Sequence, residues 1–231
     1  MTASQPLSTD PALQILWPTS TTGSATFRAL PNSQHPRLLI PTNRRTGRAT
    51  LRALRDESTR RARVRTRLLL GSWGTALAPG SSIRLPAGGI TEYVSDRLGR
   101  EIVVGVHLGP ARANRKPVLA LVTPAGEVVG YAKLGVNRLT DRLVANEAEA
   151  LVHLNAMDAT ALKGIVAPRL LLQDSWAGHS LVVQSALSHS GRAIRDPRAV
   201  TRAQVDVAHI LGTQQSASDY VSSLVHRLHT A

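Results

Sequence analysis

Hydrophobic and polar positions alternate in the middle of the chain in a way that predicts three consecutive strands. Residues 102–108 are rich in β-branched side chains and alternate in polarity, and two further apolar runs follow at 117–123 and 128–134. The segment between the last two runs, Pro124-Ala125-Gly126-Glu127, is typical of a tight turn. The pattern therefore predicts an antiparallel meander of three strands.

A helix is predicted directly after the meander. Thr140 is a candidate N-cap residue, Asp141 would lie in the first helical turn, and an apolar stripe continues through Asn155. Two more strands are predicted over 169–173 and 180–187. The predicted order is therefore β-β-β-α-β-β, an antiparallel sheet of five strands with one helix inserted after the third strand.

The chain before this unit has a different pattern. Short extended segments bounded by prolines are predicted at 13–17, 25–30 and 37–40, and an arginine-rich helix is predicted from about 46 to 70. Residues 79–89 contain prolines and glycines that predict turns around a short strand. We expect a domain boundary there.

Helical spacing of apolar residues also predicts a short helix over 90–97 and two more near 200–211 and 218–228. The expected fold class is α+β. Three regions are expected: a basic N-terminal extension with short strands and an Arg-rich helix over 1–78, the sheet domain over 79–187, and a linker with two helices over 188–231.

Composition favours a folded protein with a strongly basic N-terminal part. The chain has 231 residues, 42% of them hydrophobic, and a formal net charge of +13 at pH 7. Residues 1–75 contain twelve arginines against Asp10, Asp56 and Glu57, so this part alone carries a charge of +9. Such charge density predicts attraction to polyanions that weakens as salt is added.

Other features of the composition exclude several kinds of site. The chain has no cysteine, so neither disulfides nor thiolate metal ligands are available. No apolar run approaches the roughly 20 residues that cross a bilayer, and residues 1–11 lack the pattern of a secretory signal. His226 and His229 could share a helix face, but no third ligand accompanies them. We therefore expect a cytoplasmic protein with neither a metal site nor a membrane segment.

Lys133 stands at the end of the third predicted strand, and Glu147 lies on the helix that follows. A lysine that is partly removed from water stays charged and fixed when a carboxylate lies nearby. Glu149 is a rival partner, and the spacing alone also fits two solvated side chains. The strand order favours an ion pair that includes Lys133.

Several segments of this unit resemble one known family. They are 105–109, 116–122, Gly130-Tyr131-Ala132-Lys133, 140–151 and Leu181-Val182-Val183-Gln184. In the order β-β-β-α-β-β, with a lysine on the third strand, they resemble the protein-kinase-like small lobe of aminoglycoside phosphotransferases and related small-molecule kinases. The resemblance covers residues 100 to 190, roughly.

The resemblance implies a site for ATP. Lys133 would contact the α- and β-phosphates, and Glu147 would orient this lysine, because Glu147 rather than Glu149 matches the family's glutamate four positions before a leucine. Backbone groups of the hinge from Gln184 to Ala186 would meet the adenine.

The loop between the first two strands of the unit departs from the family. It lacks the Gly-x-Gly-x-x-Gly cover. Its side chains Arg112, Asn114, Arg115 and Lys116 would contact phosphates in place of backbone amides. The same sequence also fits an exposed basic hairpin without a ligand.

A second departure concerns catalysis. Phosphoryl transfer needs an Asp that positions the acceptor hydroxyl, an Asn shortly after it and a metal-binding Asp, and no segment after the hinge has this pattern. We therefore expect no catalytic residue in this chain, weak ATP binding, and no Mg²⁺ held by this chain alone. The prediction is a truncated or degenerate phosphotransferase that is inactive alone. An uncovered apolar face on the strand at 181–187 and on the terminal helices would bind a second polypeptide or a second copy of the chain.

The alternative is a basic protein that binds nucleic acid or other polyanions without sequence preference. It rests on the arginine-rich segment Arg60-Arg61-Ala62-Arg63-Val64-Arg65-Thr66-Arg67. The chain has only one Phe, three Tyr and three Trp, which disfavours base stacking. Such a segment is also common on solvated helix faces.

Overall fold

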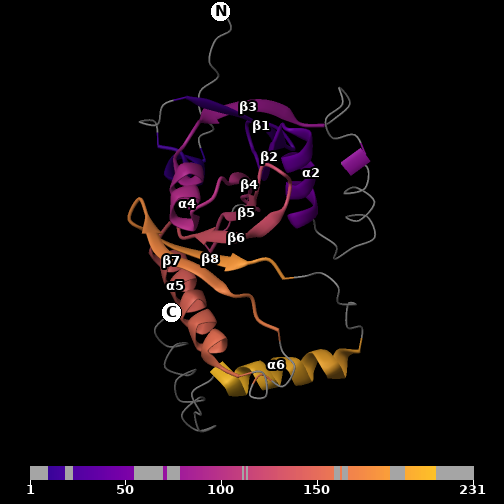
Figure 1. The fold of residues 1–231 in the computed structure, drawn as a ribbon, viewed down its shortest axis with the longest axis vertical. Coiled ribbons are helices and arrows are strands. Elements are labelled where there is room, and N and C mark those ends of the chain that lie inside the picture. Colours follow the sequence, from indigo (N-terminus) through magenta and orange to yellow (C-terminus); the bar gives the residue numbers. More distant parts are fainter. Residues whose placement is uncertain are drawn as a thin grey trace, which may run out of the picture. The chain divides into compact units, whose positions relative to one another are not determined.

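Within the residues that the structure describes, eight strands form one antiparallel sheet. The computed structural model describes residues 10–18, 23–54, 70–71, 79–110, 112, 114–158, 162, 166–187 and 196–211. Across the sheet the strand order is β3-β1-β2-β4-β5-β6-β8-β7 (Figure 1). The strands are β1 (Ser24–Leu30), β2 (Leu38–Pro41), β3 (Ser81–Pro86), β4 (Val103–His107), β5 (Val118–Val122), β6 (Val128–Leu134), β7 (Leu170–Trp176) and β8 (His179–Ser185).

The helices of the described residues are α1 (Pro11–Leu16), α2 (Arg44–Ala53), α4 (Ile90–Leu98), α5 (Arg138–Ala156) and α6 (Pro197–Leu211). The chain forms two compact units, residues 1–151 with 168–187, and residues 152–167 with 188–231. Neither unit has a border at residue 78. The sheet and the helices that position the candidate site belong to the first unit.

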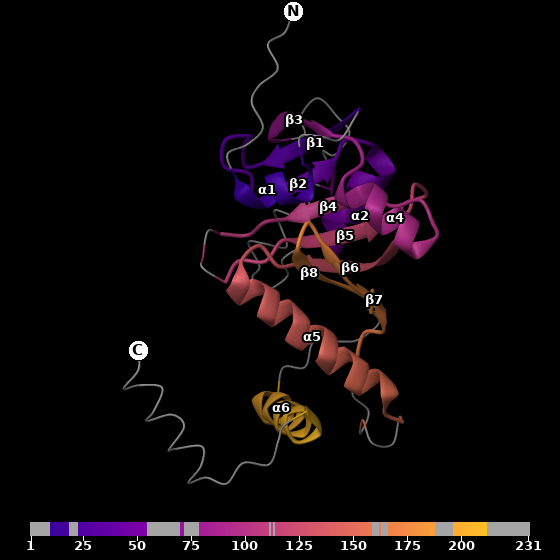
Figure 2. The ribbon, with the colours of Figure 1, turned by 90° about the vertical axis from the view of Figure 1, so that its left-hand side faces the viewer.

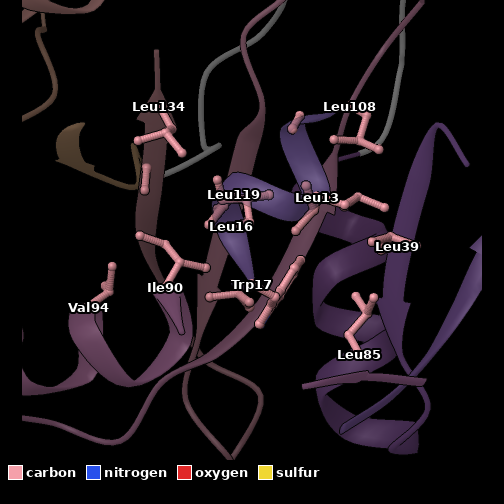
Figure 3. Packing of buried hydrophobic residues seen from close by; sticks show 14 of the residues in the cluster. Leu13, Leu16, Trp17, Leu39, Leu85, Ile90, Val94, Leu108, Leu119 and Leu134 are labelled. Carbon is pink, nitrogen blue, oxygen red and sulfur yellow. The ribbon is translucent and has the colours of Figure 1, made fainter. Parts of the chain in front are cut away.

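One face of the sheet carries the main hydrophobic core. Helices α1 and α4 cover it, and Leu13, Leu16 and Ile90 pack there against inward side chains of the central strands such as Leu119 (Figure 3). Trp17, directly after α1, is 1% exposed, and its ring centroid lies 5.5 Å from that of Phe27 in β1. The N-terminal segments are therefore part of the same core as the central strands.

The opposite face is covered by α2 and by the first part of α5. Ala49 of α2 packs with Ala120 and Val122 of β5. From α5, a stripe that includes Val144 and Ala148 packs with Val182 of β8, and Figure 2 shows α5 running beside β8 and β7. Two helices from distant parts of the sequence thus share one face of the sheet.

Helix α2 lies unusually close to β4. Gly105 in β4 has no side chain on this face, and a Cβ atom there would overlap the Thr50 methyl group. Thr50 itself is completely buried. Asn43 fixes the start of the helix, because its Oδ1 accepts hydrogen bonds from the backbone nitrogens of Arg45 (2.9 Å) and Thr46 (3.4 Å).

Two expectations about the architecture are wrong. The sheet has eight strands rather than five, because β1, β2 and β3 continue it beyond β4. Residues 13–17 are not a strand, since helix α1 occupies Pro11–Leu16. Asp10 caps that helix by accepting a hydrogen bond from the Ala12 nitrogen (3.0 Å), and proline suits the first helical position.

Most other predicted elements are confirmed: the strands at 25–30 and 37–40, the short strand within 79–89, the helix at 90–97, the central meander, and the two strands after α5. Helix α5 starts slightly before Thr140, because Asn137 Oδ1 accepts a hydrogen bond from the Thr140 nitrogen (2.9 Å). The helix predicted over 46–70 is present as α2 up to Ala53, and residues 55–69 lie outside the described part, as does the helix predicted at 218–228. In the described part of the chain, no helix combines the length and apolar character needed to cross a membrane.

The hairpin of β7 and β8 is held against α4 by a polar cluster. Arg97 Nη2 lies 2.9 Å from Asp174 Oδ2, and the Tyr93 hydroxyl donates to the Ser175 carbonyl oxygen at 3.0 Å. The rings of Tyr93 and Trp176 lie 5.0 Å apart. Hydrogen bonding by Tyr93, then by the Ser175 amide, and the charge of Arg97 hold the pKa of Asp174 below its ordinary value.

We expect acid to loosen this hairpin. A carboxylate with a lowered pKa in the folded state stabilises the fold above its unfolded pKa, about 3.9, and this contribution is lost as the pH falls through the lower folded pKa. An NMR titration should place the Asp174 pKa below that of an exposed Asp, with faster amide exchange in β7 and β8 at acid pH. Asp174→Asn should remove the acid dependence of that exchange; an unchanged dependence would assign it to other groups.

Candidate functional site

Lys133 lies on the face of the sheet that α5 covers. It belongs to β6, where it stands opposite Val118 of β5 and Val182 of β8. Its neighbours Ala132 and Leu134 are fully buried in the core of the opposite face. Because side chains alternate along a strand, Lys133 projects from the other face, toward α5.

Glu147 of α5 forms an ion pair with Lys133 through its Oε1 atom. The two side chains are 25% and 22% exposed, so each is partly removed from water and still reachable by a ligand. Glu149 is exposed. Glu147 is the inward one because it lies three residues after Val144 and next to Ala148, both in the buried stripe of the helix.

A second lysine reaches the same carboxylate. Lys116 Nζ lies 3.5 Å from Glu147 Oε2, and its side chain is 24% exposed. Val118 of β5 stands opposite Lys133, so the two side chains lie on the same face of the sheet. Lys116 is two positions before Val118, and if the extended geometry continues, its side chain lies on that face as well. From the sequence, Lys116 was predicted in the basic loop but not beside Glu147. The alternation of side chains before Val118 could have predicted this contact. Two ammonium groups and one carboxylate leave this cluster with a net charge of +1.

The start of α5 is attached to the β7–β8 hairpin, which fixes where Glu147 lies. Asp141 Oδ1 accepts a hydrogen bond from the Ser180 nitrogen at 3.1 Å. His179 Nδ1 lies 3.2 Å from both carboxylate oxygens of Asp141. The helix therefore depends on the hairpin for its position over β6.

The loop before β5 supplies fewer free side chains than the sequence suggested. Arg115 Nη2 lies 2.6 Å from Asp10 Oδ1, the atom that caps α1, and both side chains are largely buried. A phosphate contact by Arg115 would require this pair to open. Arg112 and Asn114 are exposed. Their contact with phosphate stays a prediction.

The backbone of the expected hinge is used by the sheet. Strand β8 lies between β6 and β7, and Gln184 stands opposite Tyr131 of β6 and Leu170 of β7. The Ser185 nitrogen donates to the Arg169 carbonyl oxygen at 2.8 Å, and the Ala186 nitrogen donates to that of Val129 at 3.2 Å. These two amides are not available to a base in this arrangement.

Among the residues that the structure describes, no three His, Asp or Glu side chains gather as a metal site would need. Both oxygens of Glu147 face lysines. The described residues therefore do not fit Mg²⁺ at this position.

No protein-family model matches the chain, and no curated protein is significantly similar to it. A solved structure from Haemophilus somnus 129PT, described as "Putative fructosamine-3-kinase", is similar to part of it. The match has 16% sequence identity and a TM-score of 0.32, and it covers 55% of this chain and 39% of the other. The matched part of this chain thus spans well under half the length of that protein, and a TM-score at this level does not establish a shared fold or function.

Proposed function

We propose that residues 100–187 are a kinase-like small lobe that binds phosphate groups weakly through Lys133, in a degenerate phosphotransferase of the aminoglycoside phosphotransferase type. The observation that carries the proposal is the pair of Lys133 and Glu147. It joins the third strand to the inserted helix of a β-β-β-α-β-β unit, here β4, β5, β6, α5, β7 and β8. A kinase lobe holds its phosphate-binding lysine in this way.

The charge of the cluster supports phosphate binding. Glu147 neutralises one lysine, so Lys116 remains as an added positive charge beside Lys133. Partial burial strengthens charge-assisted hydrogen bonds to phosphate oxygens, each of which contributes on the order of 1.5–3 kcal/mol. One such site without a closed cleft implies weak affinity.

The chain alone is proposed to lack phosphotransferase activity. Positioning of the acceptor and electrostatic stabilisation supply almost all of the catalysis of phosphoryl transfer. The described residues do not assemble a site for the magnesium ion that this chemistry uses. The lysine cluster can hold a phosphate, and its carboxylate, Glu147, is paired with both lysines.

We expect Lys133→Ala to weaken binding of tripolyphosphate at least about tenfold, equivalent to about 1.4 kcal/mol. Isothermal titration calorimetry measures this, with Arg100→Ala as the control, because Arg100 is exposed and its removal changes the net charge equally. Equal losses in the two variants would reduce the effect to general charge attraction and contradict the proposal.

Incubation of the purified chain with Mg²⁺, ATP and a panel of aminoglycosides and small alcohols should give no turnover. Turnover that disappears in Lys133→Ala would overturn the proposed inactivity. Turnover that requires a second polypeptide would instead locate the missing groups on that partner.

The proposed partners stay predictions. Leu181, Val182 and Val183 of β8 are at most 1% exposed, so the uncovered apolar face that was expected on 181–187 is not on this part of the strand. Arg60 to Arg67, on which nonspecific binding of polyanions was predicted, lie outside the described residues. Neither nucleic acid nor self-association gains support from a described contact.

A further inference from the structure

We propose that helix α2 occupies the place of the base on this lobe, so that the lysine site binds inorganic polyphosphates, such as pyrophosphate or tripolyphosphate, without recognising adenosine. This inference rests on the proposed function, in which Lys133 holds phosphates. The inference concerns the base of the expected nucleotide and the class of ligand that the lobe can bind.

The path that a nucleotide would follow on this lobe crosses Tyr131. The expected hinge at 184–186 lies beside residues 129–131 of β6, with Gln184 opposite Tyr131. Tyr131 and Lys133 are two positions apart in the same strand and therefore project from the same face. A ligand with phosphates on Lys133 and a base at the hinge must lie over Tyr131.

The C-terminal half of α2 already covers that position. The Tyr131 hydroxyl donates a hydrogen bond to the Ala53 carbonyl oxygen at 3.2 Å. Ala53, Leu54, Val128 and Tyr131 pack together around the buried core of Ala49, Ala120 and Val122. The surface that a base would contact is therefore partly covered by a helix of the chain itself.

Two further contacts hold the C-terminal half of α2 in place. Thr50 packs directly on the backbone of Gly105, with no room for even one extra carbon atom between them. Leu51 packs with Ile40 of β2, and both are almost fully buried. A base could enter only if these contacts were broken.

The hinge amides give an independent reason. The nitrogens of Ser185 and Ala186 donate within the sheet, to Arg169 and Val129. A base that took these amides would break two hydrogen bonds that hold the strands of the sheet together, which costs free energy. Lys116 and Lys133 differ from the hinge amides because an ammonium group has three donors. Each side chain is more than 20% exposed and can donate to a phosphate while it stays paired with Glu147.

The test compares ligands with equal numbers of phosphates on the full-length chain: tripolyphosphate with ATP, pyrophosphate with ADP, and adenosine alone. We expect tripolyphosphate to bind at least as tightly as ATP, within about threefold, with the same for pyrophosphate and ADP, and no competition by adenosine. Lys133→Ala should weaken all four phosphorylated ligands at least tenfold. Hydrogen exchange of the amides of residues 47–54 should be the same with and without ATP.

ATP that binds more than tenfold tighter than tripolyphosphate, or that accelerates exchange in 47–54, would overturn this inference and leave the proposed function standing. Failure of every phosphorylated ligand to bind, or binding that is insensitive to Lys133→Ala, would overturn the proposed function and this inference with it. Tyr131→Phe keeps the ring and removes the hydroxyl group that donates to Ala53. It should leave the tripolyphosphate affinity unchanged, and a tenfold loss there would contradict the assignment of Tyr131 to the base position.

Discussion

Replacement of Trp17 by alanine is expected to lower the free energy of unfolding by about 4 kcal/mol. Trp17 is 1% exposed and packs with Phe27 of β1 and with the core that also contains Ala132 and Leu134, the two neighbours of Lys133 in β6. Removal of the indole leaves a cavity beside the central strands. Urea unfolding followed by circular dichroism measures the loss, which is large for a domain of ordinary stability.

Val166→Ala is the control for this experiment. Val166 is 76% exposed, and its truncation should change the free energy of unfolding by less than about 0.5 kcal/mol. A loss of under 1 kcal/mol in Trp17→Ala would mean that the segment before β1 is a separate extension. The result thus bears on the site as well, because the same core supports the strand that carries Lys133.

Gly130→Ala is expected to destabilise the fold by about 3 kcal/mol, at the upper end of the range for overpacking. A Cβ atom at Gly130 would overlap the carbonyl oxygen of Gln184, which belongs to the backbone of the neighbouring strand. Strand β8 cannot move away easily, because it is paired with β7 on its other side. The denaturant midpoint should fall and the slope of the transition should stay the same.

Gly71→Ala is the matched substitution, since a Cβ atom at that position meets no atom of the described residues within 4 Å. It should be close to neutral. If Gly130→Ala were equally neutral, the close approach of β6 and β8 at the expected hinge would be wrong. The arrangement of Gln184 and Ala186 on which the exclusion of a base depends would then also be in doubt.

The element order around the site could be predicted because each element has a local cause. Alternating β-branched residues predict the meander, and the apolar stripe from Val144 to Leu151 predicts α5 and its inward side. Side-chain alternation in β6 places Lys133 on the face that α5 covers. The helical periodicity of α5 places Glu147 on the side that faces the sheet, so the two side chains meet. The strand predicted over residues 13–17 was wrong for a local reason as well. The N-cap Asp10 and the proline at the first helical position favour a helix over the short apolar run.

The extent of the sheet could not be predicted in the same way. Strands β1 and β2 were expected, but the pairing of β2 with β4 joins segments more than sixty residues apart, as in the pair Leu39 and Val106. No local pattern encodes which edges meet, since any strand exposes the same backbone donors and acceptors. The division at residue 78 was inferred from turn residues, whereas β3 returns to pair with β1.

The sequence by itself determined most of the strands and the inserted helix, because periodicity acts within a few dozen residues, and the resemblance to a known family selected Glu147 rather than Glu149 as the partner of Lys133. Only the tertiary structure decided that Lys116 shares Glu147, that Arg115 is taken by Asp10, and that α2 covers Tyr131. These contacts depend on which helix packs on which sheet face. That choice follows from the fit of whole surfaces, such as Thr50 on the bare backbone of Gly105, and such a fit exists only once the chain has folded.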